Sequence, residues 1–163
     1  MSLFDCARWP LTAVVLASIG LAAAAPASAA SPFAGLSGSW SGGGQIRLEN
    51  GRSESIRCSA HYAPRGGAAL GLALRCASAS NRIELRASLA SSGDRVSGSW
   101  EERSYNASGN VSGLASGNSL RLSISGGALS AFMVVRTTGG SQSISVRTDS
   151  AALKGVNISL RRN

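Results

Sequence analysis

Apolar and polar residues alternate one by one along most of the chain after residue 45. In the run from Ile56 to Tyr62, for example, every second residue is apolar, and serine, arginine or histidine stands between. A period of two places successive side chains on opposite faces of a β-strand, one dry and one wet. The same alternation recurs at Ile46–Leu48, Leu70–Cys76, Ile83–Leu89, Val96–Trp100, Leu120–Ile124, Ile144–Val146 and Val156–Leu160.

Short clusters rich in glycine, asparagine and serine separate these runs. They lie at Glu49–Arg52, Pro64–Gly67, Ser91–Asp94, Asn106–Gly109 and Thr138–Ser141. Asparagine and glycine accept the positive φ of tight hairpins, and links this short cannot form parallel crossovers. The sequence therefore predicts an all-β protein, an antiparallel meander of eight to ten strands that can close into a barrel. Two segments are less regular, and neither has an assignable inward side: residues 110–117, and residues 128–136, which are predicted to form a strand covered on both faces.

The first thirty residues have the pattern of a secretory signal peptide. Arg8 precedes an uncharged apolar run from Leu11 to Ala25, and Ala27-Ser28-Ala29 supplies small residues for cleavage. The expected organisation is a signal peptide at residues 1–30 and one β-barrel domain at 31–163. The predicted location is periplasmic or secreted.

Two cysteines remain after residue 30, Cys58 and Cys76, and they are symmetric about Gly67. Folding the hairpin at Pro64–Gly67 would place the two thiols opposite each other on the apolar face. An even number of cysteines in an oxidising compartment favours a disulfide. A thiol nucleophile or a metal pair is the alternative reading.

The chain carries a formal net charge of +8. Because an exported protein seldom meets nucleic acid, the expected anions are envelope polyanions such as lipopolysaccharide or acidic glycans. Arg82, Arg86 and Arg121, all on the wet phase of their strands, are the candidate polyanion-binding residues. The alternative is that these arginines only keep the barrel in solution.

Catalytic groups are sparse, and the sequence predicts no enzyme. His61 lies on the wet phase and is expected to be a surface residue. Glu101 and Glu102 are adjacent on a strand, so they point to opposite faces and cannot form an acid/base pair with each other. Glu102, in phase with Trp100, is expected to face inward or to lie at a barrel rim, where its role would be that of a structural carboxylate paired with an arginine. No cofactor motif or metal-ligand cluster is present, so neither a cofactor nor a metal is predicted.

Gly38-Ser39-Trp40, together with Arg161-Arg162 near the C-terminus, resembles the calycin superfamily (lipocalins, avidins and their relatives). In lipocalins a Gly-x-Trp opens the first strand, and a late arginine packs across the tryptophan at the closed end of the barrel. The resemblance implies that Gly38, Trp40 and Arg162 form a structural barrel end and that the opposite end is an open mouth. The mature sequence as a whole resembles exported β-proteins of high-GC Gram-negative bacteria, which implies no activity.

These observations predict an exported, non-enzymatic β-barrel with a binding or structural role in the cell envelope. Its partner would be a small apolar ligand or an envelope polyanion, and its oligomeric state stays open. A resemblance of Leu36–Trp40 to periplasmic inhibitors of serralysin-type proteases gives the alternative function, inhibition through Ser31-Pro32-Phe33. An outer-membrane barrel is disfavoured because aromatic girdles are lacking, and a hydrolase with a dispersed site is disfavoured because the chain has one histidine.

Overall fold

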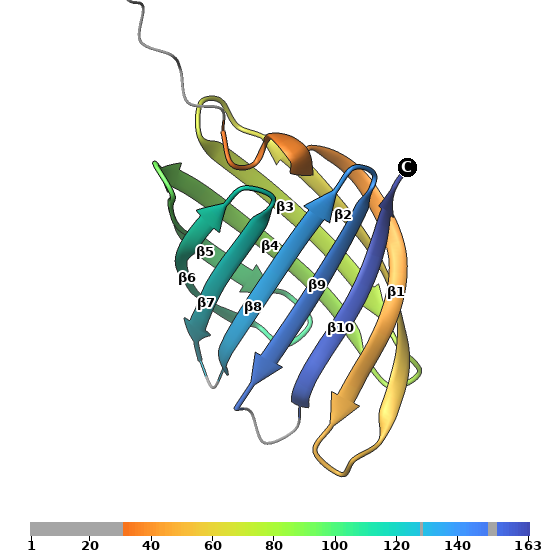
Figure 1. Ribbon diagram of the computed structural model, residues 1–163. Coiled ribbons are helices and arrows are strands. Elements are labelled where there is room, and N and C mark those ends of the chain that lie inside the picture. Colours follow the sequence, from red (N-terminus) through yellow and green to blue (C-terminus); the bar gives the residue numbers. More distant parts are fainter. Residues whose placement is uncertain (1–30, 128, 150–152) are drawn as a thin grey trace, which may run out of the picture.

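The computed structural model describes residues 31–127, 129–149 and 153–163, which form a closed ten-stranded antiparallel barrel (Figure 1). The proposed signal peptide lies outside the described residues. The strands are β1 (Gly38–Leu48), β2 (Ser53–Pro64), β3 (Ala69–Ala77), β4 (Arg82–Ser92), β5 (Arg95–Glu102), β6 (Ala107–Ser116), β7 (Ser119–Gly126), β8 (Leu129–Thr138), β9 (Ser141–Thr148) and β10 (Leu153–Arg162). A single 3-10 turn, η1 (Ala34–Leu36), precedes β1. Within the described residues no helix is long and apolar enough to cross a membrane.

The strands follow one another around the barrel in the order of the sequence. Each pairs antiparallel with its neighbours, and β1 pairs with β10 to close the ring. The predicted meander is therefore confirmed, with ten strands. Antiparallel order also sorts the turns by end: β1 begins and β10 ends at the same end of the barrel. We call this the Trp40 end, and it carries the β2–β3, β4–β5, β6–β7 and β8–β9 turns (Figure 1).

Alternation divides the side chains between the inside and the outside of the barrel. The buried core is almost entirely apolar and includes Trp40, Leu70, Val96 and Leu160, each at most 2% exposed. The intervening outward positions are mostly serine and arginine. This arrangement is the reverse of a transmembrane barrel, whose apolar residues face the lipid outside.

The two irregular segments become β6 and most of β8. In β6, Val111 and Ala115 are buried, whereas Leu114 points outward and is 50% exposed. In β8 the prediction of a strand covered on both faces is wrong, because Phe132 is 47% exposed. The prediction assumed that a continuous apolar run is covered on both faces of its strand. In β8 apolar residues do lie on both faces, but only the inward face is covered.

The closing seam between β1 and β10 depends on glycine. A Cβ built on Gly44 would lie 1.8 Å from the Asn157 carbonyl oxygen, and one on Gly42 would lie 2.1 Å from the Ser159 carbonyl oxygen. Both positions are on the inward phase of β1. Backbones can approach this closely only where a Cβ is missing.

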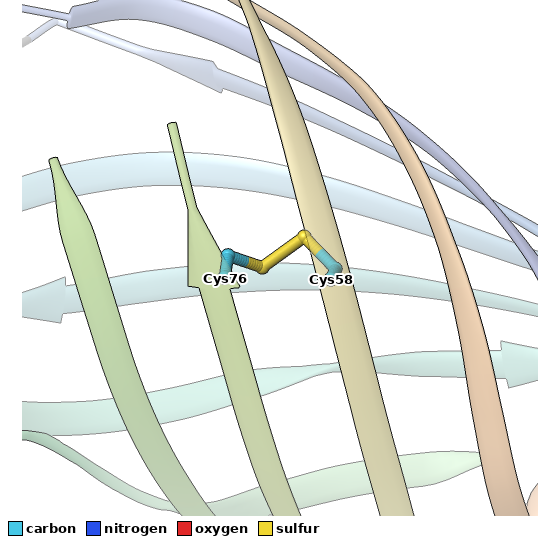
Figure 2. Close-up of a disulfide and its surroundings, with 2 residues drawn as sticks. All are labelled: Cys58 and Cys76. Atoms are coloured by element: carbon cyan, nitrogen blue, oxygen red, sulfur yellow. A yellow bond between two sulfur atoms is a disulfide. The ribbon is translucent and has the colours of Figure 1, made fainter. Parts of the chain in front are cut away.

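A disulfide joins Cys58 on β2 to Cys76 on β3 (Figure 2). The two residues are direct cross-strand partners, with their Cα atoms 4.1 Å apart, and both side chains are buried. The predicted pairing and hairpin register are confirmed.

Replacing Cys58 with serine is expected to lower the free energy of unfolding by about 3 kcal/mol, because the bond closes a short loop in the unfolded chain. Urea titration of the oxidised wild type and of Cys58→Ser would measure the difference. Wild-type protein treated with reductant is the control and should lose a similar amount. A change below about 1 kcal/mol in both would contradict the entropic account.

Candidate ligand-binding site

The N-terminal segment covers part of the Trp40 end. Residues 31–36 fold into a tight turn in which the Ala34 N–H donates to the Ser31 carbonyl at 3.0 Å. The turn places Phe33 and Leu36 in the barrel end, where they are 2% and 4% exposed. The side chains of Phe33 and Leu36 thus fill part of this end of the barrel, and η1 holds them in place. We call these two side chains the stopper.

Trp40 anchors this segment from the barrel interior. Its indole is completely buried, and its Nε1–H donates to the Leu36 carbonyl at 2.7 Å. The guanidinium of Arg162 lies over the ring, with its Cζ 4.4 Å from the ring centre. Arg162 also donates to the carbonyls of Ser37 and Gly35, the latter at 2.7 Å.

Gly38 completes the predicted barrel end. It has φ of +108° and lies where a Cβ would be 3.3 Å from Arg162 Nη1. The structure therefore brings Gly38, Trp40 and Arg162 together at one end of the barrel. Arg162 packs across Trp40, as the resemblance to lipocalins implied. The C-terminus is tied to the same place, because the Asn163 N–H donates to the Ser39 carbonyl at 3.0 Å.

Beside this stopper lies a cavity of about 630 Å³. Its inward-facing apolar lining comes from Leu36, Ala115, Leu120 and Val135. Its rim comes from the N-terminal segment and three turns, and consists of Ser31, Pro32, Gly35, Gly93, Asp94, Gly117, Asn118, Thr137, Gly139 and Arg162. An apolar floor with a few polar groups at its rim is the usual composition of a small-molecule site.

A buried chain of hydrogen bonds leads to the cavity from the barrel interior. The Tyr62 hydroxyl donates to Gln142 Oε1 at 2.9 Å, and Gln142 Nε2 donates to Thr137 Oγ1 at 3.3 Å. Burial raises the pKa of Tyr62 to about 12, so its hydroxyl stays protonated and remains a donor. Thr137 is thus a positioned polar group in the lining of the cavity.

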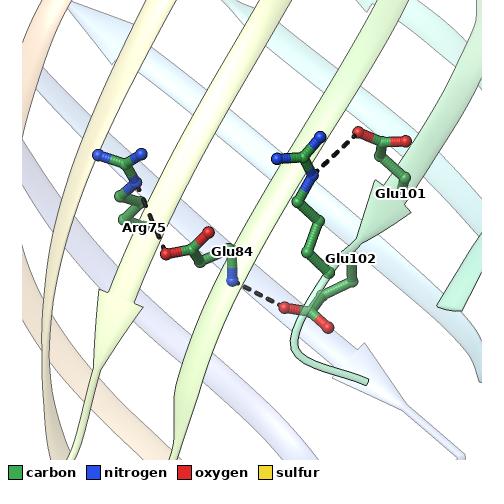
Figure 3. Close-up of polar contacts among 5 residues, drawn as sticks. Arg75, Glu84, Glu101 and Glu102 are labelled. Atoms are coloured by element: carbon green, nitrogen blue, oxygen red, sulfur yellow. Dashed lines mark hydrogen bonds and ion pairs between the residues drawn. The ribbon is translucent and has the colours of Figure 1, made fainter. Parts of the chain in front are cut away.

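Glu102 lies at the opposite end of the barrel with its side chain buried, as its phase predicted. The predicted arginine partner is wrong, because the ion pairs among the described residues do not include Glu102. Glu102 is 7% exposed. Its carboxylate accepts the N–H of Glu84 at 2.7 Å (Figure 3), and it also accepts the N–H of Tyr105 at 2.7 Å. Burial acts to raise the pKa of Glu102, but these backbone donors outweigh it and hold the pKa below its usual value. The role of Glu102 is to fix the β5–β6 turn; its neighbour Glu101 pairs with Arg103 at 3.6 Å on the outside.

The three candidate polyanion-binding arginines do not meet on one surface. Arg82 and Arg86 are on β4, and Arg121 is on β7, three strands further around the barrel. Carboxylates also lie beside the first two arginines. Glu84 stands between them on the same outward face and pairs with Arg75 at 3.9 Å (Figure 3). Glu101 is directly across from Arg86 on the neighbouring strand. The β4 surface is therefore of mixed charge.

His61 lies on the outside, as predicted, and its Nδ1 is 3.0 Å from Ser39 Oγ. It borders a polar groove of about 740 Å³ across β2–β6 whose other walls include Arg65, Arg86 and Glu101. The residues available for metal binding are spread out, and the described part of the chain holds no cluster of three or more histidine, cysteine or carboxylate side chains.

The segment proposed for protease inhibition is engaged with its own barrel. Phe33 is one of the two stopper residues. It is 2% exposed, and its N–H donates to Ser31 Oγ at 3.3 Å. Insertion of Ser31-Pro32-Phe33 into a protease cleft would first require Phe33 to leave the core. This arrangement gives the inhibitor hypothesis no support.

Comparison with known proteins supports the fold. No protein-family model matches the chain, and none of the curated proteins matches it. Among solved structures, the crystal structure of Rv2717c from M. tuberculosis is similar, with a TM-score of 0.67 and 16% identity. The match covers 80% of this chain and 94% of that chain. At this identity the likeness concerns the barrel fold alone.

The sequence did not indicate this cavity: the resemblance to lipocalins implied an open mouth at the opposite end of the barrel, whereas the cavity lies at the Trp40 end. Its rim residues belong to turns that are far apart along the chain, at Gly93-Asp94, Gly117-Asn118 and Gly139. Each of these reads as an ordinary tight turn, and only closure of the ring brings them together. The Trp40–Arg162 pair, in contrast, had a signal in the sequence: the resemblance of Gly38-Ser39-Trp40 and Arg161-Arg162 to lipocalins implied it.

Proposed function

We propose that this protein is an exported, non-enzymatic binding protein that holds a small, largely apolar ligand in the cavity at the Trp40 end. The observation that carries the proposal is the position of the cavity. It opens at the end of a closed barrel, between a fixed stopper and three turns, and its floor is made of inward-facing apolar side chains.

The size and chemistry of the cavity suit such a ligand. Its volume of about 630 Å³ falls within the range of about 300–1,000 Å³ that is usual for ligand pockets. Polar groups of the ligand would meet Thr137, Asn118, Asp94 or Arg162 at the rim. Binding is favoured over catalysis because these lining residues include neither a histidine nor a cysteine that could act as base or nucleophile.

The proposed location outside the cytoplasm has separate support. The Cys58–Cys76 disulfide is a feature of oxidising compartments, and the first thirty residues have the composition of a signal peptide. An exported barrel with this cavity would carry or sequester a small molecule in the cell envelope.

Filling the cavity tests the proposal. Ala115 lines it and is 8% exposed, so Ala115→Phe would place an aromatic ring at its floor. We expect this change to weaken binding of an apolar fluorescent probe, 1-anilinonaphthalene-8-sulfonate, by about tenfold or more, because the ring competes for the space. Fluorescence titration would measure the dissociation constant, and native mass spectrometry of protein from its own host would show any retained molecule.

The matched control is Ala107→Phe. Ala107 is on the same strand and also faces inward, but it lies at the opposite end of the barrel and does not line the cavity. Its variant should bind the probe within about twofold of wild type. Equal losses in both variants, or saturable binding that neither changes, would count against the cavity.

A further inference from the structure

The outer surface of β6–β9 combines exposed apolar and cationic side chains. Cross-strand register places Leu114 opposite Arg121, Arg121 opposite Val134, and Phe132 opposite Arg147. Arg136 follows two residues after Val134 on the same side of β8. We call these six outward residues the basic face: Leu114, Arg121, Phe132, Val134, Arg136 and Arg147. Serine occupies most of the remaining outward positions between them.

The apolar members of the basic face are unusually exposed for this barrel. Leu114 and Phe132 are 50% and 47% exposed, and Val134 between them is half-buried. Large apolar residues gathered on the outside of a protein mark surfaces that contact a partner or a membrane. Each of the two larger ones has an arginine directly across the strand, so apolar and cationic groups are presented together.

The charge of this surface has one sign. Residues 107–148 contain no aspartate or glutamate, and their charged residues are Arg121, Arg136 and Arg147. The ion pairs found in the described part of the chain lie elsewhere, on Arg75–Glu84, Arg103–Glu101 and Lys154–Glu49. The nearest carboxylate along β9 is Asp149, which follows the strand. Three of the eight net positive charges therefore lie on the surface where Leu114 and Phe132 are exposed, with no carboxylate on these strands.

We propose that the basic face docks the protein on an anionic lipid surface. Arginines would meet the lipid phosphates while Phe132 and Leu114 enter the boundary between headgroups and acyl chains, as an amphipathic surface does. Charge complementarity selects this occupant, because a neutral or a cationic partner would leave three arginines without counter-charges. The docking surface is on the side of the barrel and separate from the cavity, so it does not depend on the proposed ligand.

Vesicle cosedimentation tests this inference with residues 31–163, the part of the chain that forms the barrel. Wild type should bind vesicles of phosphatidylcholine with 30% phosphatidylglycerol (a composition chosen for the assay) and should bind pure phosphatidylcholine at least about tenfold more weakly. Binding should weaken as salt is raised, since screening shortens the reach of the arginine charges.

Two variants locate the docking surface. Arg121→Gln combined with Arg147→Gln should weaken binding to the anionic vesicles by about 25-fold, from about fivefold for each arginine near a charged membrane. Phe132→Ser should weaken it by about fivefold to tenfold without changing the net charge, because it removes the larger apolar anchor.

The control removes the same charge from the mixed surface of β4. Arg82→Gln combined with Arg86→Gln lowers the net charge equally but leaves the basic face intact, and we expect a loss of less than about threefold. In Figure 1 the β7–β10 part of the wall lies in front of β3 and β4, so the two pairs act on different sides of the barrel. All variants should keep the wild-type melting temperature within a few degrees, because the four arginines and Phe132 lie outside the core.

Four outcomes would overturn the inference. They are no binding of wild type to anionic vesicles, equal binding to neutral vesicles, equal losses from the β4 and β7–β9 arginine pairs, and no effect of Phe132→Ser. The last result, together with salt-sensitive retention on heparin, would indicate a soluble polyanion instead of a lipid surface. Dimers in sedimentation velocity that Phe132→Ser dissociates would assign the face to a second copy of the chain.

Discussion

Replacing Gly44 with alanine is expected to lower the free energy of unfolding by at least about 3 kcal/mol, and to prevent folding if wild type is only marginally stable. The added Cβ would fall 1.8 Å from the Asn157 carbonyl oxygen, well inside van der Waals contact. Backbone atoms cannot swing aside as a flexible side chain can, so β10 would have to move away from β1. Moving β10 breaks the pairing that closes the ring.

Urea titration followed by far-ultraviolet circular dichroism would measure this effect. Gly140→Ala is the matched control, because a Cβ at Gly140 meets nothing within 4 Å and its φ is not positive. It should change the free energy of unfolding by less than about 0.5 kcal/mol. If the two variants were equally stable, the seam would be able to relax around a methyl group.

Trp40→Ala is the second substitution with a large expected effect, a loss of about 3–5 kcal/mol in the free energy of unfolding. It removes a fully buried indole, the hydrogen bond to the Leu36 carbonyl and the surface on which Arg162 rests. Phe33 and Leu36 would lose the residue that anchors their segment. The same denaturation experiment would measure the loss, and limited proteolysis should show earlier cleavage within residues 31–37.

Two further variants divide the contribution of Trp40. Trp40→Phe keeps most of the apolar area but loses the donor to Leu36, and should cost less than half as much as Trp40→Ala. Arg162→Ala leaves the indole in place and should cost about 1–2 kcal/mol, because the cation–π contact and the hydrogen bonds to the Ser37 and Gly35 carbonyls are each weak at an exposed arginine. A loss below about 1 kcal/mol for Trp40→Ala would mean that the stopper adds little to the stability of the barrel.

The sequence predicted the fold well because local rules determine most of it. Period-two alternation and tight turns define neighbouring hairpins, and the symmetry of Cys58 and Cys76 about Gly67 gave the register of one hairpin directly. Within β8 the rule failed, since Phe132 and Val134 are apolar but point outward. Alternation can assign an inward side only when the outward side is polar.

The candidate sites were harder to predict because they depend on how the ring closes. Strand number and stagger determine which turns lie side by side at one end of a barrel. No local sequence pattern therefore predicts that Asp94, Asn118 and Gly139 line the same cavity. The separation of Arg121 from Arg82 and Arg86 has the same origin. Glu102 illustrates a different limit: its inward phase was predictable, but its partners are backbone N–H groups of a turn, which side-chain chemistry alone does not reveal.

Pairing of β1 with β10 determines which strand pair forms last when the chain folds during synthesis. Every other strand pair in the described barrel joins neighbours in sequence, whereas the seam pairs Trp40 with Arg162. A chain that emerges from its N-terminus can complete the β2–β3 hairpin and its disulfide early, but β1 keeps one row of N–H and C=O groups unsatisfied until β10 arrives. Any chain cut short before Leu153 would keep two such open edges, which are templates for aggregation.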